Sequence, residues 1–137
     1  TNEFIDYITM ASNSDAIDFG DLSQARNNMC YHTRSSSTRG IFAGGIIPAT
    51  GDTIDSTTIA SIGNATDFGN LTEGRRLAFN VSTQTRAVFA GGYNNVQSMD
   101  YITIASAANA IDFGEMVGKR RYSGGACSDS HGGLGGF

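Results

Sequence analysis

The triplet Asp-Phe-Gly occurs three times in the chain, and its carboxylate is the first candidate for chemistry. The copies lie at residues 18–20, 67–69 and 112–114. In phosphoryl-transfer enzymes such a triplet holds magnesium, but that chemistry also needs a glycine-rich loop, a strand lysine and a catalytic-loop aspartate. The sequence shows no such set. We therefore expect each triplet to form a turn, in which Asp bonds the local backbone, Phe packs between repeats and Gly ends a strand.

The other acidic residues and the histidines do not suggest a catalytic or metal centre. One aspartate recurs in each copy of the repeat, at Asp6, Asp55 and Asp100. A calcium site needs several oxygen ligands converging in one loop, and only the short loop from Asp52 to Asp55 comes near that pattern. His32 and His131 are the only histidines and fall in different repeats. We predict no catalytic residue, no metal site and no cofactor.

The charge and composition of the chain argue against nucleic acid and membranes as partners. The net charge is −4 and the arginines are spread along the chain, which disfavours nucleic acid as a partner. No apolar run approaches the ~20 residues that span a bilayer, and the chain starts without a signal-peptide pattern, so we expect no membrane insertion. Cys30 and Cys127 occupy different positions of the repeat. Two separate buried thiols are expected, with a disulfide as the alternative.

An arginine follows the glycine of each triplet at the same distance, at Arg26, Arg75 and Arg120. Two interpretations stay open. In the first, these arginines tie neighbouring repeats together by bonding backbone carbonyls or the recurring aspartates. In the second, they form a ring that faces a ligand near a central channel.

Recognition is expected where the copies differ. The segment after the Gly-Gly pair is IIPATGDTI in one repeat and YNNVQSM in the next. In a four-stranded unit this segment connects the second and third strands. It lies on the same face as the connection from the fourth strand to the first strand of the next unit, which carries the arginines. We predict a binding rim for sugar or peptide contact, formed by Tyr93, Asn94, Asn95, Arg75 and Arg76.

The strands that position these residues are predicted from an internal repeat of the sequence. The Gly-Gly pair at residues 44–45 recurs 47 residues later, at 91–92, a period typical of radial or solenoid repeat folds. Alternating β-branched residues predict a strand over 100–106 and a short return strand over 111–113. Further strands are predicted over 75–82 and 86–90, the latter ended by Gly-Gly. Four short antiparallel strands per repeat indicate an all-β fold and one propeller blade per repeat, with a β-solenoid as the alternative.

In this arrangement the repeat resembles the kelch motif, in which a strand ends in Gly-Gly and a short strand carries an aromatic residue. The positions that carry the resemblance are Gly44–Gly45, Gly91–Gly92, Phe19, Phe68, Phe113, Arg26, Arg75 and Arg120. The chain departs from kelch in having Phe in the short strand where that motif usually has Trp. It also has Phe42 and Phe89 two residues before Gly-Gly, whereas the motif usually has Tyr just before Gly-Gly. The repeat also resembles tandem repeats in structural or tail-fibre-type proteins of marine bacteriophages. The resemblance to kelch implies a β-propeller.

We expect one domain over residues 1–137, with repeats at about 1–45, 46–92 and 93–137 and three four-stranded blades per chain. Three blades are too few to close a ring. A head-to-tail homodimer is therefore expected, in which the termini of two chains form composite blades of a six-bladed ring. A nine-bladed trimer is one alternative, and a fragment of a longer chain is the competing interpretation. The expected function is a non-enzymatic structural or binding module of a virion or extracellular surface, recognising glycan or a host surface protein. The alternative is a glycan-active propeller enzyme, a hydrolase or lyase.

Overall fold

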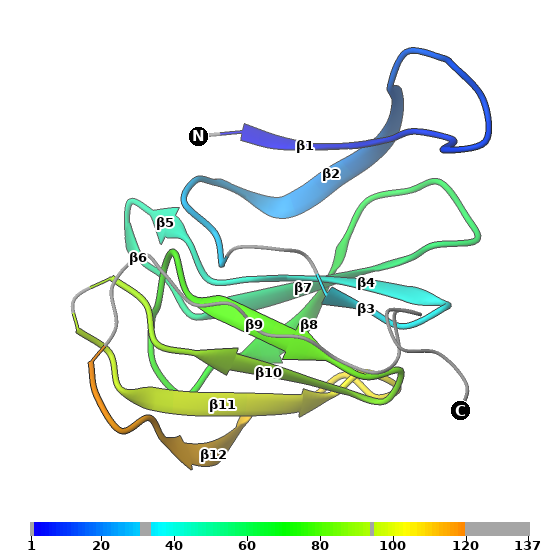
Figure 1. Cartoon of the computed structure of the whole chain (residues 1–137). Coiled ribbons are helices and arrows are strands. Elements are labelled where there is room, and N and C mark those ends of the chain that lie inside the picture. Colours follow the sequence, from blue (N-terminus) through cyan, green and yellow to red (C-terminus); the bar gives the residue numbers. More distant parts are fainter. Residues whose placement is uncertain (1, 31–33, 94, 120–137) are drawn as a thin grey trace.

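The computed structural model describes residues 2–30, 34–93 and 95–119, and all regular structure in these ranges is β (Figure 1). The predicted all-β class is therefore confirmed. The first unit is an antiparallel pair, β1 (Asn2–Tyr7) with β2 (Ile17–Arg26). It precedes two four-stranded antiparallel sheets in which spatial order follows chain order.

The middle sheet runs in the order β3-β4-β7-β8. Its strands are β3 (Arg34–Ser35), β4 (Arg39–Ala43), β7 (Thr53–Thr58) and β8 (Thr66–Asn70). A small hairpin, β5 (Ile46–Ile47) with β6 (Ala49–Thr50), lies in the connection between β4 and β7. The last sheet contains β9 (Phe79–Ser82), β10 (Arg86–Ala90), β11 (Ser98–Thr103) and β12 (Ile111–Glu115).

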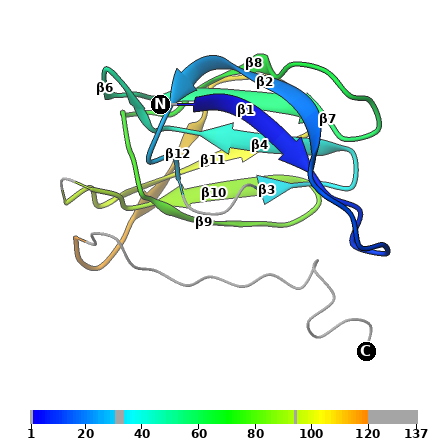
Figure 2. The ribbon, with the colours of Figure 1, turned by 90° about the horizontal axis from the view of Figure 1, so that it is seen from above.

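The three units are stacked in chain order. The β1–β2 pair lies over the middle sheet, which lies over the last sheet, and both views of the ribbon agree on this order (Figures 1 and 2). The buried apolar cluster draws side chains from both four-stranded sheets, including Ile41, Ile54, Phe68, Phe89, Ile102 and Ile104. The hydrophobic stabilisation therefore comes from packing successive repeats against each other.

The alternation of buried and exposed side chains in β11 follows the predicted period of two. Ile102 and Ile104 are buried, whereas Thr103 between them is exposed and Tyr101 is half-buried. The strand predicted over 100–106 starts two residues earlier and ends at Thr103. The two Gly-Gly pairs end β4 and β10 as predicted, because Gly44 and Gly91 adopt φ of 65° and 67°, which glycine tolerates best.

The strand predicted over 75–82 is wrong in its first half, since β9 begins at Phe79. Leu77 has φ of 53°, a left-handed conformation that cannot continue a strand. The backbone of Arg75 is engaged elsewhere: its N–H donates to the Gly51 carbonyl at 3.1 Å and its carbonyl accepts from Gly45 at 3.0 Å. Residues 75–78 thus form a connection held against the middle sheet.

The prediction that each Asp-Phe-Gly triplet is a turn is also wrong. Each triplet lies inside a strand as a β-bulge, in which the phenylalanine is the extra residue. The predicted local bond is present in all three copies: Asp18, Asp67 and Asp112 each accept a hydrogen bond from the N–H of the triplet's own glycine, at 3.0–3.1 Å. Those glycines have φ of 128° to 145°. The strand then continues past the glycine instead of ending there.

Candidate binding rim

The recurring arginines and aspartates meet across the junctions between neighbouring units. Asp55 of β7 is fully buried and accepts three hydrogen bonds from β2. Ser23 donates through its N–H at 3.1 Å and its hydroxyl at 2.6 Å, and Arg26 donates through Nη2 at 2.8 Å. Burial lowers the pKa of the Arg26 guanidinium, and the Asp55 carboxylate opposes that change.

The second junction repeats this arrangement. Asp100 of β11 accepts from the N–H and the hydroxyl of Thr72, at 2.9 and 2.6 Å, and lies 3.0 Å from Nη2 of Arg75. Arg75 also donates to the carbonyl and the hydroxyl of Ser98, at 3.0 and 2.9 Å. The interpretation that these arginines tie neighbouring repeats to the recurring aspartates is confirmed for Arg26 and Arg75. Arg120 lies outside the described residues.

Arg75 therefore does not contribute an accessible cation to the predicted rim. Its relative exposure is 0%, and its guanidinium faces Asp100 and the backbone of the last sheet. The interpretation of a ligand-facing arginine ring fails for Arg26 and Arg75, because both side chains are enclosed between sheets. A closed ion pair of this kind has its acceptors filled and its proton-transfer groups out of reach of a substrate.

Its neighbour Arg76 does meet the predicted aromatic residue. The guanidinium carbon of Arg76 lies 3.9 Å from the centre of the Tyr93 ring, and the Tyr93 N–H donates to the Arg76 carbonyl at 2.9 Å. Both side chains are half-buried. Tyr93 follows the Gly-Gly pair that ends β10, and Arg76 belongs to the connection between β8 and β9. The expectation that these two connections share one face is thus confirmed for this pair.

The two predicted asparagines extend the same loop. Asn95 is exposed and has φ of 62°, a conformation that asparagine adopts more readily than most residues. Asn94 lies outside the described residues. The rim as the structure places it consists of Arg76, Tyr93 and Asn95, which we call the Arg76–Tyr93 rim.

The structure also contains a concave surface that the sequence did not predict. A hollow of about 240 Å³ is lined by Thr38, Arg39, Thr58, Ile104 and Ala105. Arg39 begins β4 and Gly44 follows its end, so the hollow lies at the opposite end of the sheets from the Arg76–Tyr93 rim. Arg39 donates to the Ile104 carbonyl at 2.7 Å and lies over the Phe68 ring at 5.7 Å. The signal in the sequence was an arginine five residues before each Gly-Gly pair, at Arg39 and Arg86.

The described residues hold no cluster of three or more His, Cys, Asp or Glu side chains that could bind a metal ion. Nor does any helix in these ranges have the length and apolarity to cross a membrane. No protein-family model matches the chain, and no curated protein matches its sequence. The resemblance to kelch repeats therefore rests on the spacing and types of the repeated residues alone.

Proposed function

We propose that the chain is a non-enzymatic binding module built from kelch-like β-propeller blades, three per chain and six in a homodimer. Two features support the propeller. The middle and last sheets are each four-stranded meanders, and they are stacked with the same ion pair that joins the first unit to the middle sheet. A radial array of such sheets is a rigid scaffold, which suits display of loops on one face.

The observation that carries the binding role is the stacking of Arg76 on Tyr93. Tyr93 lies on the connection whose sequence differs between repeats and Arg76 lies on a connection that shares its face, whereas the residues common to the repeats are used in the junctions. An aromatic face with a neighbouring guanidinium offers both an apolar surface and fixed hydrogen-bond donors. A sugar ring or an extended peptide matches those groups. The proposed ligand is a glycan or a surface protein of a host, and the proposed setting is a virion or extracellular surface.

The experiment is a glycan array combined with a hydrolysis screen on the same glycans. We expect stable binding without cleavage, and Arg76→Ala and Tyr93→Ala should each weaken binding by about tenfold or more. Arg86→Ala is the matched control, because Arg86 lies over the Tyr101 ring at 4.5 Å, away from the rim. Its binding should equal that of the wild type. Cleavage of a bound glycan, or equal loss in all three variants, would overturn the proposal.

A further inference from the structure

The contact between neighbouring units is built twice in the chain from the same backbone groups. In the first, the bulge of β2 meets the loop between β7 and β8. The Gly63 N–H donates to the Phe19 carbonyl at 2.8 Å, the Ala65 N–H donates to the Asp21 carbonyl at 2.7 Å, and Asn64 accepts from the Asp21 N–H at 3.1 Å.

The second contact repeats two of these three bonds between β8 and the loop that precedes β12. The Ala110 N–H donates to the Asn70 carbonyl at 2.7 Å, and the Asn109 side chain accepts from the Asn70 N–H at 3.0 Å. Close approach is possible because the bulge residue is glycine. A Cβ atom on Gly20 or Gly69 would lie 2.5 Å from the carbonyl oxygen of the facing loop, which is shorter than any van der Waals contact.

The third bulge has the same geometry and no facing loop among the described residues. Gly114 has φ of 128°, and a Cβ atom placed on it would meet nothing within 4 Å. Phe113 is 49% exposed, whereas Phe68 at the same position of the middle sheet is 3% exposed. We call Phe113, Gly114 and Glu115, with the exposed Val117, the tail surface.

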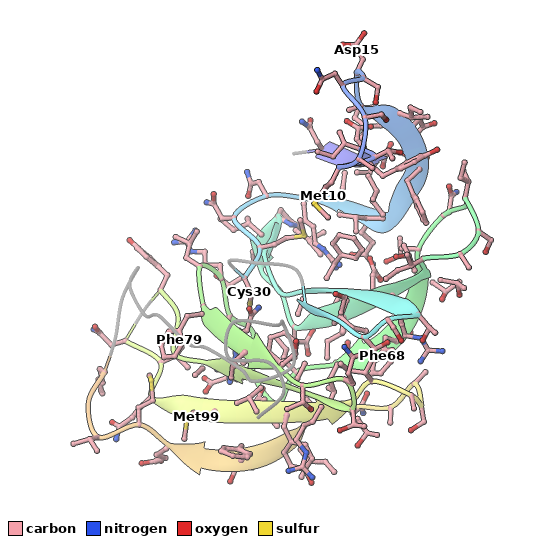
Figure 3. All side chains as sticks on the ribbon, turned by 45° about the vertical axis from the view of Figure 1, so that its right-hand side comes forward. Met10, Asp15, Cys30, Phe68, Phe79 and Met99 are labelled. Atoms are coloured by element: carbon pink, nitrogen blue, oxygen red, sulfur yellow. The ribbon has the colours of Figure 1, made fainter. Side chains whose placement is uncertain are left out.

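The opposite end of the stack carries the matching half of this contact. Asp15 occupies the position of Asn64 and Asn109 and stands at the tip of the β1–β2 connection (Figure 3). Ile8 is 62% exposed, whereas Ile102 at the same position of β11 is 2% exposed and belongs to the cluster that contains Phe68. We call Asp6, Ile8, Met10 and Asp15 the head surface.

We infer that the tail surface of one chain binds the head surface of a second copy of the same chain. The Ser14 and Ala16 N–H groups of one copy then donate to the Phe113 and Glu115 carbonyls of the other, and the Asp15 carboxylate accepts from the Glu115 N–H. Ile8 and Phe113 become buried at this contact. A second copy is the occupant because the described residues present both halves of an interface that recurs inside the chain, one half on the last sheet and the other on the β1–β2 unit. Two such contacts close a dimer.

The new contact is weaker than the internal ones in one respect. The hydroxyls of Ser23 and Thr72 bond the buried aspartates at the internal junctions, and Val117 stands at the corresponding position of the tail surface. Asp6, the counterpart of Asp55 and Asp100, is exposed on the head surface. It therefore gains no hydroxyl partner, and we expect a reversible dimer instead of a permanent one.

This inference rests on the stacked-blade architecture of the proposed function but not on its ligand. The test is sedimentation velocity of the full chain over a range of concentrations, with three variants. Ile8→Asp alters the head surface, and Gly114→Ala alters the tail surface. Ile62→Asp is the matched control, because Ile62 is 65% exposed on the loop before β8 and its counterpart Ala107 is exposed as well.

We expect the wild type and Ile62→Asp to form dimers, and Ile8→Asp and Gly114→Ala each to stay monomeric. A mixture of these two monomeric variants should form a dimer, since one intact head then meets one intact tail. A wild type that stays monomeric at about 100 µM would overturn the contact between two copies, and this is the result expected if further repeats of one polypeptide cover both surfaces instead. Failure of the two variants to associate in the mixture would also overturn the contact. Growth without limit would overturn the closed dimer. Tyr93→Ala should dimerise normally, so loss of glycan binding and loss of association are separable.

Discussion

The two internal junctions use the same ion pair but hold their arginines differently. Arg75 bonds Asp100 and also the carbonyl and hydroxyl of Ser98. Arg26 bonds Asp55, and its only other acceptor among the described residues is the Phe42 carbonyl at 3.4 Å. Its Nε and Nη1 atoms make no hydrogen bond within those residues. A repeated sequence therefore reproduces the ion pair, while the surrounding strands decide how many further bonds each arginine makes.

The junctions also differ in what they join. The first joins the two-stranded β1–β2 unit to the middle sheet, and the second joins two four-stranded sheets. A two-stranded hairpin has little stability of its own. We expect the β1–β2 unit to open locally at a lower free energy than the two four-stranded sheets, which should unfold together.

The largest difference is expected from deleting the arginines. Arg75→Ala leaves Asp100 buried without its cation and should lower the free energy of unfolding by about 3–5 kcal/mol. Arg26→Ala should release mainly the β1–β2 unit and leave the main transition in place. Urea unfolding followed by circular dichroism measures the first effect, and hydrogen exchange of the β2 amides measures the second. Equal loss of the main transition in both variants would contradict the comparison.

A smaller difference is expected from the bulge glycines. Gly69→Ala places a methyl group against the Ala108 carbonyl, in a backbone conformation that costs about 1–3 kcal/mol for a residue with a side chain. Gly114→Ala has the same conformational strain and no facing backbone. Measured by urea unfolding of the monomer at low concentration, Gly69→Ala should be the less stable of the two. If both variants lose the same stability, close approach at the junction contributes nothing.

The smallest effect concerns the thiol that lies near both arginines. Burial raises the pKa of Cys30 to about 11, and the positive charges of Arg75 and, more weakly, Arg26 oppose that rise. The thiol is therefore protonated in the folded chain at a pH where the unfolded thiol, with an ordinary pKa of 9.0, already ionises. The unfolded state then binds fewer protons, so the free energy of unfolding should fall as the pH rises from about 9 to about 11.

This pH dependence should be shallower in Cys30→Ala, measured against the wild type in a Cys127→Ala background. Thiol reactivity in the same background tests the two arginines. Arg75→Gln should raise the pKa of Cys30 more than Arg26→Gln does. The reverse order would show that the first junction lies closer to the thiol in electrostatic terms.

Strand positions were predictable because they depend on local patterns. The alternation of side chains predicted β11, and the Gly-Gly pairs correctly marked the ends of β4 and β10, because Gly44 and Gly91 adopt φ of 65° and 67°, a left-handed conformation that cannot continue a strand. The bulges at the three Asp-Phe-Gly triplets were not predictable, because a glycine of positive φ after an Asx-type bond serves equally in a turn and in a bulge. Only pairing with the adjacent strand separates the two.

The candidate site was predictable in part for a similar reason. Tyr93 and Arg76 were brought together by reasoning from the order of strands, which sets the face on which a connection lies. The burial of Arg75 was not predictable from its type, because a charged residue is buried only when a partner compensates it. That partner, Asp100, belongs to the next repeat, and the sequence left two roles for the arginine open. The exposure of Phe113 likewise depends on a neighbouring unit and not on the triplet itself.

The central claim is that the recurring Arg–Asp pair couples neighbouring repeats. A double-mutant cycle tests it most directly, with Arg75→Gln, Asp100→Asn and the double variant compared with wild type by urea unfolding. These substitutions keep polarity and nearly keep size. We predict a coupling free energy of about 2 kcal/mol or more, because each residue loses its buried partner in the single variants. Effects that add to within about 0.5 kcal/mol would contradict the claim.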